Sequence, residues 1–128
     1  MNEDVDGLLV SASCWLDEAA ADRLTDTGRA ALTDDGQGRP VLHLPGARVV
    51  AADPVARQLA LEQVLRRSLD ELAACGVDRA LVTGTGARVR LSVSLCPVDG
   101  SAGIVLAADM LLPWVALGAD VFIDAQVG

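Results

Sequence analysis

The segment Arg88–Cys96 constrains the fold more than any other part of the chain. Apolar and polar residues alternate strictly through its sequence, RVRLSVSLC. A period of two is typical of a β-strand with one buried face, and such strands belong to antiparallel sheets that are covered on one side only. The sequence therefore predicts a sheet in which Val89, Leu91, Val93 and Leu95 face the core.

Two further segments show the same alternation. In Gly7–Leu16 one face carries Leu8, Val10, Ala12, Cys14 and Leu16, whereas Trp15 falls on the other face. In the last strand Val121, Ile123 and Ala125 point one way and Asp120, Phe122 and Asp124 point the other way. The period of two thus places both aromatic rings on the polar faces of their strands.

Between the second and third of these strands we expect a turn at Asp99-Gly100, a short strand at Gly103–Leu106 and a helix from an Asp109 cap to Leu117. Gly118 suits the left-handed position after a helix. Pro113 leaves two alternatives, because proline is tolerated only in the first helical turn. The helix either begins as late as Asp109 or is kinked at Pro113.

The longest predicted element is a helix over residues 53–74. Asp53-Pro54 is a typical helix start, with a capping side chain followed by proline, and Cys75-Gly76 ends the helix. Leu61, Leu65, Leu69 and Leu72 share one face, which we expect to be buried. The charged residues Arg57, Arg67, Asp70 and Glu71 are expected to lie mainly away from it.

The remaining segments are shorter. Asp17 can cap a short helix, and an acidic, glycine-punctuated flexible connection is expected near residues 25–39, with one helical turn around Arg29–Leu32. The sequence VLHLPGARVVAA predicts two short strands split by Pro45-Gly46, as a hairpin or as a bent edge. Val77–Thr83 is predicted to be a further strand.

These elements predict a single α+β domain over residues 1–128. A chain of 128 residues is long enough to bury a core without disulfides or metals. We expect a largely antiparallel sheet of about six or seven strands, backed by one long helix and one or two short helices. The sheet faces that no helix covers are the expected working surface.

Charge and composition exclude several classes of partner. The net charge is -8, which disfavours nucleic acids and anionic membrane surfaces because both attract basic proteins. No segment has the roughly 18 uninterrupted apolar residues of a membrane span, and the acidic start MNEDVDG does not resemble a signal peptide. Cys14, Cys75 and Cys96 are odd in number and far apart, which favours the reducing cytoplasm.

Three motifs contain residue types that occur in reactive or binding sites. GTGARV lacks the third glycine and the following helix of a dinucleotide loop, and Asp22, Asp26, Asp34 and Asp35 lack the spacing of a calcium loop. His43, the only histidine, has no nucleophile beside it in the sequence, although Cys14, Cys75, Cys96 or a serine could partner it in the fold. We therefore expect no catalytic residue, no metal and no cofactor.

Trp15 and Phe122 are the strongest indication of a binding surface. The chain is only 2% aromatic, and two rings on polar strand faces would form an exposed apolar spot if the first and last strands were neighbours. We predict that Trp15, Phe122, Asp120 and Asp124 contact a protein partner. The alternative is that a helix or loop of the same chain covers the two rings.

The C-terminal 70 residues or so combine a long helix before an alternating strand, Leu117-Gly118-Ala119 at the end of a helix, and the apolar strand VFIDA with Asp124. With these features this part of the chain resembles the bacterial family known as domain of unknown function 4279. The N-terminal half departs from the family pattern, and Gln126 stands where the family has a closing tyrosine. The resemblance implies an α+β fold and no established reaction or substrate.

Two functions are compatible with these observations. The first is a cytoplasmic, non-enzymatic interaction or accessory module that binds a protein partner or a second copy of itself. One form of it is an immunity protein in which an acidic surface blocks a basic toxin. The second is a small-molecule binding protein or enzyme with a pocket between sheet and helices that uses His43, Arg88 and Arg90. A flat, open sheet face would favour the first, and a concave pocket containing His43 would favour the second.

Overall fold

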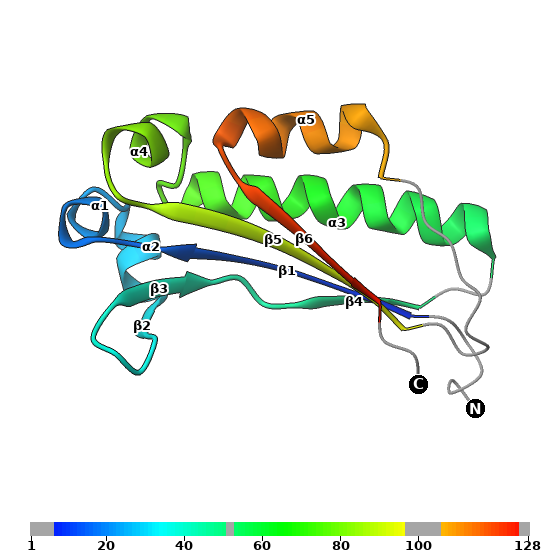
Figure 1. Ribbon diagram of the computed structural model, residues 1–128, viewed down its shortest axis with the longest axis horizontal. Coiled ribbons are helices and arrows are strands. Elements are labelled where there is room, and N and C mark those ends of the chain that lie inside the picture. The colour runs from blue at the N-terminus through cyan, green and yellow to red at the C-terminus, as the bar shows by residue number, and fades with distance from the viewer. Residues whose placement is uncertain (1–6, 51–52, 97–105, 126–128) are drawn as a thin grey trace.

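A six-stranded sheet organises the molecule, and the larger helices lie on one side of it (Figure 1). The computed structural model describes residues 7–50, 53–96 and 106–125. Helices α3 (Pro54–Ala74), α4 (Arg79–Gly84) and α5 (Ala108–Leu117) form the second layer, and α1 (Glu18–Asp22) and α2 (Asp26–Ala30) lie at one end of the sheet. The prediction of an α+β architecture with one long helix and shorter helices is confirmed.

The strand order is β2-β3-β1-β5-β6, and β4 also pairs with β1. The strands are β1 (Gly7–Trp15), β2 (Leu32–Asp34), β3 (Pro40–His43), β4 (Ala47–Val50), β5 (Arg88–Cys96) and β6 (Asp120–Ala125). All pairs are antiparallel except β5 with β6, which are parallel. A parallel pair needs a crossover connection, and the connection between β5 and β6 contains α5. The predicted sheet of about six strands, largely antiparallel, is confirmed.

The alternating residues of β1 and β5 build the centre of the core. The two strands pair along their whole length, from Gly7 opposite Cys96 to Trp15 opposite Arg88. Leu95 near the end of β5 is partly buried, and the other core-facing side chains have at most 1% of their surface exposed: Leu8, Val10, Ala12, Cys14, Val89, Leu91 and Val93. Each large side chain buried in this way contributes about 1.5–3 kcal/mol, so this alternation sets the register of the sheet.

The strand that follows β2 is bent at Pro45-Gly46. Both halves, β3 and β4, pair with β1 and not with each other. The backbone N–H of Leu44 still donates to Ala12 O at 3.0 Å, immediately before the break. Proline has no N–H to continue the ladder. The bent strand is therefore the correct choice between the two predicted alternatives.

Helix α3 has the predicted bounds and the predicted apolar face. The side chain of Asp53 accepts from the backbone N–H of Ala56, and the chain leaves the helix through Gly76, whose φ is +94°. Leu61, Leu65 and Leu72 are buried and Leu69 packs partly buried against the same core. Arg57 differs from the expectation, since it is buried as well, with 6% of its surface exposed.

Residues 77–83 do not form the predicted strand. Most of this segment belongs to α4, because the side chain of Asp78 accepts from Leu81 N at 2.9 Å and caps a helix there. Leu81 inside the helix and Val77, which precedes the cap, are both buried. The Asp78 cap therefore turns the predicted strand into a helix.

Two other predicted boundaries are corrected. The helical turn expected around Arg29–Leu32 lies earlier, at Asp26–Ala30, because Thr25 caps it, and residues 32–34 form strand β2 instead. Helix α5 begins at Ala108 with Ala107 as its cap, so Asp109 lies in the first turn and Pro113 in the helix interior. Gly118 adopts the predicted left-handed conformation, with φ +87°.

Some predictions fall on parts of the chain that the structure does not describe. The turn at Asp99-Gly100 and all but the last residue of the predicted strand Gly103–Leu106 lie outside the described residues, and Leu106 is not in a strand. No helix within residues 7–50, 53–96 and 106–125 combines the length and the apolar character needed to cross a membrane.

Candidate functional site

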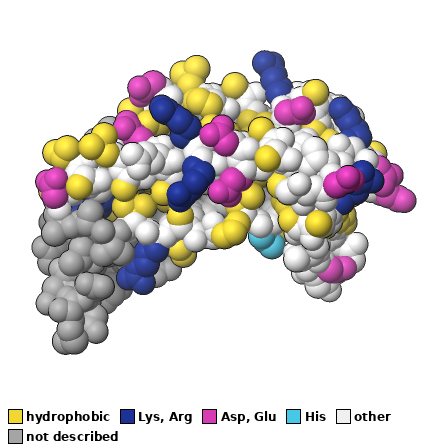
Figure 2. Space-filling view, turned by 180° about the vertical axis from the view of Figure 1, so that it is seen from behind, with side chains coloured by type: hydrophobic (Ala, Val, Ile, Leu, Met, Phe, Trp, Pro, Cys, Tyr) yellow, Lys and Arg dark blue, Asp and Glu magenta, His cyan; other side chains and the backbone are white. Residues whose placement is uncertain are grey.

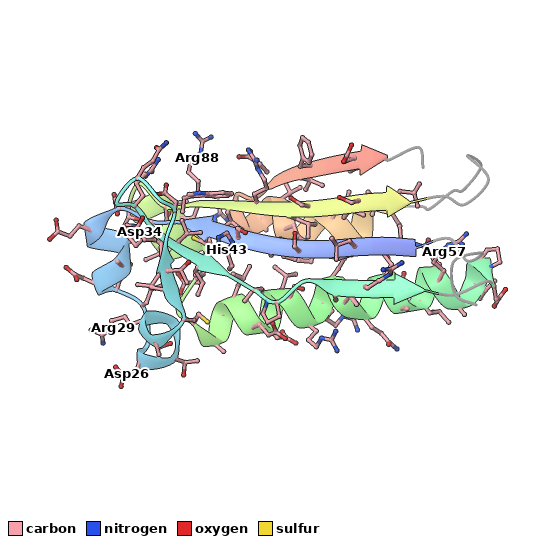
Figure 3. The ribbon with its side chains drawn as sticks, turned by 90° about the horizontal axis from the view of Figure 1, so that it is seen from below. Asp26, Arg29, Asp34, His43, Arg57 and Arg88 are labelled. Carbon is pink, nitrogen blue, oxygen red and sulfur yellow. The ribbon has the colours of Figure 1, made fainter. Side chains whose placement is uncertain are left out.

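The face of the sheet turned away from α3, α4 and α5, which we call the open face, is the candidate functional site. Figure 3 looks onto it, and none of the described helices lies across it. Strand alternation and register assign the following side chains to it: Leu9, Ser11, Ser13 and Trp15 from β1, Thr33 from β2, His43 and the fully buried Val41 from β3, Arg48 from β4, Arg88, Arg90, Ser92 and Ser94 from β5, and Asp120, Phe122 and Asp124 from β6. All four predicted partner-binding residues and all three predicted ligand-binding residues therefore share one face.

Arg90 lies between the two aromatic rings of the open face. Its Cζ atom is 5.5 Å from the centre of the Trp15 ring and 5.7 Å from that of Phe122. Cation–π contacts at exposed sites contribute about 0.5–1 kcal/mol each. Phe122 is 52% exposed, whereas Trp15 is half-buried.

The two rings lie on strands that are not neighbours, because β5 runs between β1 and β6. The condition for one shared apolar spot is therefore not met, and Arg90 of β5 lies close to both rings instead. The alternative of a covering helix is not seen among the described helices, so Phe122 remains accessible in this part of the structure.

A transverse row of polar side chains crosses the open face beside this stack. Ser13 is the register partner of both His43 and Arg90, and Arg90 is the partner of Asp120. Ser13 Oγ and His43 Nδ1 are 2.7 Å apart. The hydroxyl donates in this pair when the imidazole carries its proton on Nε2.

The Ser13–His43 pair is half of a nucleophilic arrangement. A serine nucleophile also needs a group that orients the base and donors that stabilise an oxyanion. No carboxylate of the described chain is hydrogen-bonded to His43. The pair therefore acts as a cross-strand hydrogen bond in this structure, and it supplies no argument for catalysis.

A shallow hollow of about 300 Å³ opens at one end of the open face, and we call it the arginine hollow. Its lining comprises Trp15, Arg39, Arg88, Val89, Arg90 and Asp120. Arg88 Nη2 lies 3.8 Å from Asp120 Oδ2, and both side chains are largely exposed. His43 is not part of this lining. The hollow thus joins a guanidinium cluster to an aromatic ring.

The open face carries more unpaired positive charge than the net charge of the chain suggests. Among the described residues no carboxylate forms an ion pair with Arg39, Arg48 or Arg90. The acidic side chains assigned to the face are Asp120 and Asp124. Asp17, which lies near Arg39, accepts from Ala20 N at 2.8 Å and Gly86 N at 2.8 Å. These two backbone bonds hold the pKa of Asp17 below its usual range.

The other motifs have structural explanations. Asp34 and Asp35 accept from backbone amides of the β2–β3 turn, among them Gly36 N at 2.7 Å and Gln37 N at 2.8 Å. No group of three potential metal ligands exists within the described ranges. Burial raises the pKa of the Cys14 thiol to about 11, which makes it a poor nucleophile. The GTGARV segment leads into β5 and not into a helix.

Two members of the site could not be singled out from the sequence. Arg39 lay in a predicted connection, and only the β2–β3 pairing brings it to the arginine hollow. Ser13 was assigned to the correct face, but its partner depended on the order of the strands. For Arg39 the sequence did contain a signal: Pro40 follows it directly, and proline often begins a strand.

Comparison with protein-family models, with curated proteins and with solved structures found no match to this chain. The resemblance of the C-terminal half to the domain of unknown function 4279 family therefore stays a prediction.

Proposed function

We propose that this protein is a non-enzymatic, cytoplasmic interaction module that binds a protein partner through the open face. The observation that carries the proposal is the Trp15–Arg90–Phe122 stack on a sheet face that none of the described helices covers. Tryptophan and arginine are enriched among the residues that dominate binding energy at protein interfaces. A flat face with a few anchors of this type favours a protein surface over a small ligand.

The residues of the alternative function support the same choice. His43, Arg88 and Arg90 lie on the open face, on the opposite side of the sheet from α3 and α5. A site built from them would be shallow, whereas small-molecule sites enclose most of their ligand. The arginine hollow is open to solvent and does not include His43. The geometry therefore favours the interaction module over an enzyme with an enclosed pocket.

The proposal is tested by paired substitutions on opposite sides of the molecule. Phe122→Ser removes an exposed anchor from the open face, and Val115→Ser removes an apolar side chain of similar exposure, 65% against 52%, from α5. Partners are captured from the native host, purified, and titrated against both variants by calorimetry. Light scattering during size-exclusion chromatography measures self-association of the same variants.

We expect Phe122→Ser to weaken binding or self-association by about tenfold or more and Val115→Ser to leave it unchanged. Both variants should melt close to wild type, because surface substitutions usually change stability by less than about 0.5 kcal/mol. Equal binding by wild type and Phe122→Ser, or loss of binding only in Val115→Ser, would show that the open face is not the interface.

A further inference from the structure

Three arginines, Arg39, Arg88 and Arg90, gather at the arginine hollow beside the Trp15 ring. Arg29 and Arg67 on the helices each have a carboxylate partner, Asp26 at 3.1 Å and Glu71 at 4.0 Å. In the hollow, Arg39 and Arg90 have no ion pair with a carboxylate of the described chain, and Arg88 has only a long one with Asp120. The hollow thus presents several guanidinium donors to whatever binds there.

The two aromatic rings restrict the position of the Arg90 guanidinium group, which can donate hydrogen bonds to a bound partner. The ring centres of Trp15 and Phe122 lie 5.5 and 5.7 Å from its Cζ atom, and no carboxylate of the described chain forms an ion pair with it. A guanidinium held in this way loses less conformational freedom on binding. Its planar fork matches a carboxylate, which it can bind in a bidentate manner.

We propose that the arginine hollow binds the carboxylate side chains of an acidic segment of the protein partner. This inference rests on the proposed function and names the chemistry of the contact. The hollow is small and open, so it accommodates a side chain of a larger partner and leaves the rest of that partner to contact Phe122. Free anions do not reach Phe122, so they lack the apolar contact that a larger partner makes on the same face.

Asp120 is the internal competitor of the proposed ligand. Its carboxylate already lies 3.8 Å from Arg88 and lines the hollow. An incoming carboxylate would meet repulsion from Asp120 and would have to replace it beside Arg88. Removal of this one negative charge should therefore strengthen binding, whereas the removal of a guanidinium should weaken it.

The matched control for Asp120 is Asp124, two residues further along the same face of β6. Both substitutions to asparagine change the net charge equally, but Asp124 is not part of the hollow. Arg48 is the corresponding control for the arginines, because it lies on the open face beside Leu9 and outside the hollow. These controls separate a local contact from a general change in charge.

The probe is a hexaglutamate peptide, titrated at about 0.15 M salt, where screening over about 8 Å suppresses the long-range repulsion. Binding is followed by Trp15 emission in a Trp114→Phe background and by calorimetry. We expect Arg39→Gln and Arg90→Gln to weaken binding about tenfold, Asp120→Asn to tighten it severalfold, and Asp124→Asn and Arg48→Gln to change it less than twofold.

Several results would overturn the inference. The first is the absence of hexaglutamate binding, and the second is an equal effect of Asp120→Asn and Asp124→Asn on that binding. The third is binding of inorganic phosphate as tightly as the peptide, which would indicate a simple anion site.

Failure of this inference is distinguishable from failure of the proposed function. If Phe122→Ser abolishes partner binding while hexaglutamate does not bind, the open face is the interface and its ligand is not acidic. If hexaglutamate binds as expected while Phe122→Ser leaves partner binding intact, the acidic contact exists and the proposed interface fails.

Discussion

Gly28 provides the sharpest test of how the N-terminal helices are attached to the rest of the fold. It is buried in α2, and a Cβ atom added there would overlap the carbonyl oxygen of Cys75 and lie 3.0 Å from its carbonyl carbon. The same carbonyl accepts from Thr25 N at 3.0 Å, and Thr25 Oγ1 donates to Ala74 O at 2.8 Å. Gly28→Ala must therefore push α2 away from the end of α3.

The expected cost follows from three contributions. Alanine in a helix is favoured over glycine by about 1 kcal/mol, which opposes the clash. Forcing extra volume into a packed contact costs about 1–3 kcal/mol, and the loss of the two Thr25 hydrogen bonds costs about 1 kcal/mol each. We expect Gly28→Ala to lower the free energy of unfolding by about 3 kcal/mol, which corresponds to about 10 °C in melting temperature for a domain of this size.

Thermal unfolding followed by circular dichroism measures this effect, with Gly84→Ala as the control. Gly84 ends helix α4, and an added Cβ there would meet only the end of the flexible Arg23 side chain at 3.0 Å. We expect Gly84→Ala to stay within about 1 kcal/mol of wild type. If Gly28→Ala melts at or above the wild-type temperature, the close approach of α2 to Cys75 is refuted.

Three further predictions concern stability and pH. The buried Cys14 thiol, with its pKa raised to about 11, keeps its proton in the folded chain while the unfolded chain ionises near pH 9. In a chain without lysine or tyrosine, the free energy of unfolding should thus fall by about 2 kcal/mol between pH 9 and pH 11. Urea titrations should show that the free energy of unfolding of Cys14→Ala falls less over this range. The same fall in Cys14→Ala as in wild type would contradict this prediction. The lowered pKa of Asp17 means that its stabilising effect is present above about pH 4 and lost as the pH falls further, so the melting temperatures of Asp17→Ala and wild type should differ at pH 7 and converge at low pH. Pro113 lies inside α5, where it cannot donate to Asp109 O, and Pro113→Ala should raise stability by about 1–2 kcal/mol in the same melts; a lower melting temperature would show that the proline is needed.

Much of the fold could be predicted because its main elements carry their own signals. The strict alternation in β1 and β5 identifies both the strands and their buried faces. In β6 it identifies the strand, but Ile123 on the core side is 56% exposed. Helix α3 is delimited at one end by Asp53-Pro54 and at the other by Gly76. In these segments local preference and tertiary packing agree, so the sequence alone determines the structure.

The errors occur where local signals are short or conflict. The three residues of β2 are too few to show an alternating pattern, and they become a strand only through their pairing with β3 across the turn of residues 35–39. Residues 77–83 are predicted to be a strand, but the side chain of Asp78 caps a helix that begins at Arg79. Such short elements depend on tertiary contacts more than on composition.

The candidate site, too, could be predicted only in part from the sequence. Alternation correctly placed Trp15 and Phe122 on the face opposite the core, because that assignment needs only the sequence of each strand. The order of the strands decides which side chains lie between the rings, and no local pattern reveals that order. Arg90 was therefore assigned to an alternative ligand site, although it is the residue that joins the two aromatic anchors.

The acidic side chains of the protein have two kinds of role: some cap helices and turns, and others lie on the open face. Asp17, Asp53 and Asp78 cap helices with their carboxylates, and Asp34 and Asp35 close the β2–β3 turn. These side chains contribute to the net charge but are held by backbone amides at the ends of elements. On the open face the sheet register brings together three arginines, Arg48, Arg88 and Arg90, and two carboxylates, Asp120 and Asp124. Because contact energies depend on the groups that meet and long-range steering depends on the total charge, an immunity-type role against a basic toxin would have to use the acidic groups outside this face. We therefore expect the net charge to govern how fast a partner approaches, and the guanidinium groups around Trp15 to govern which partner stays bound.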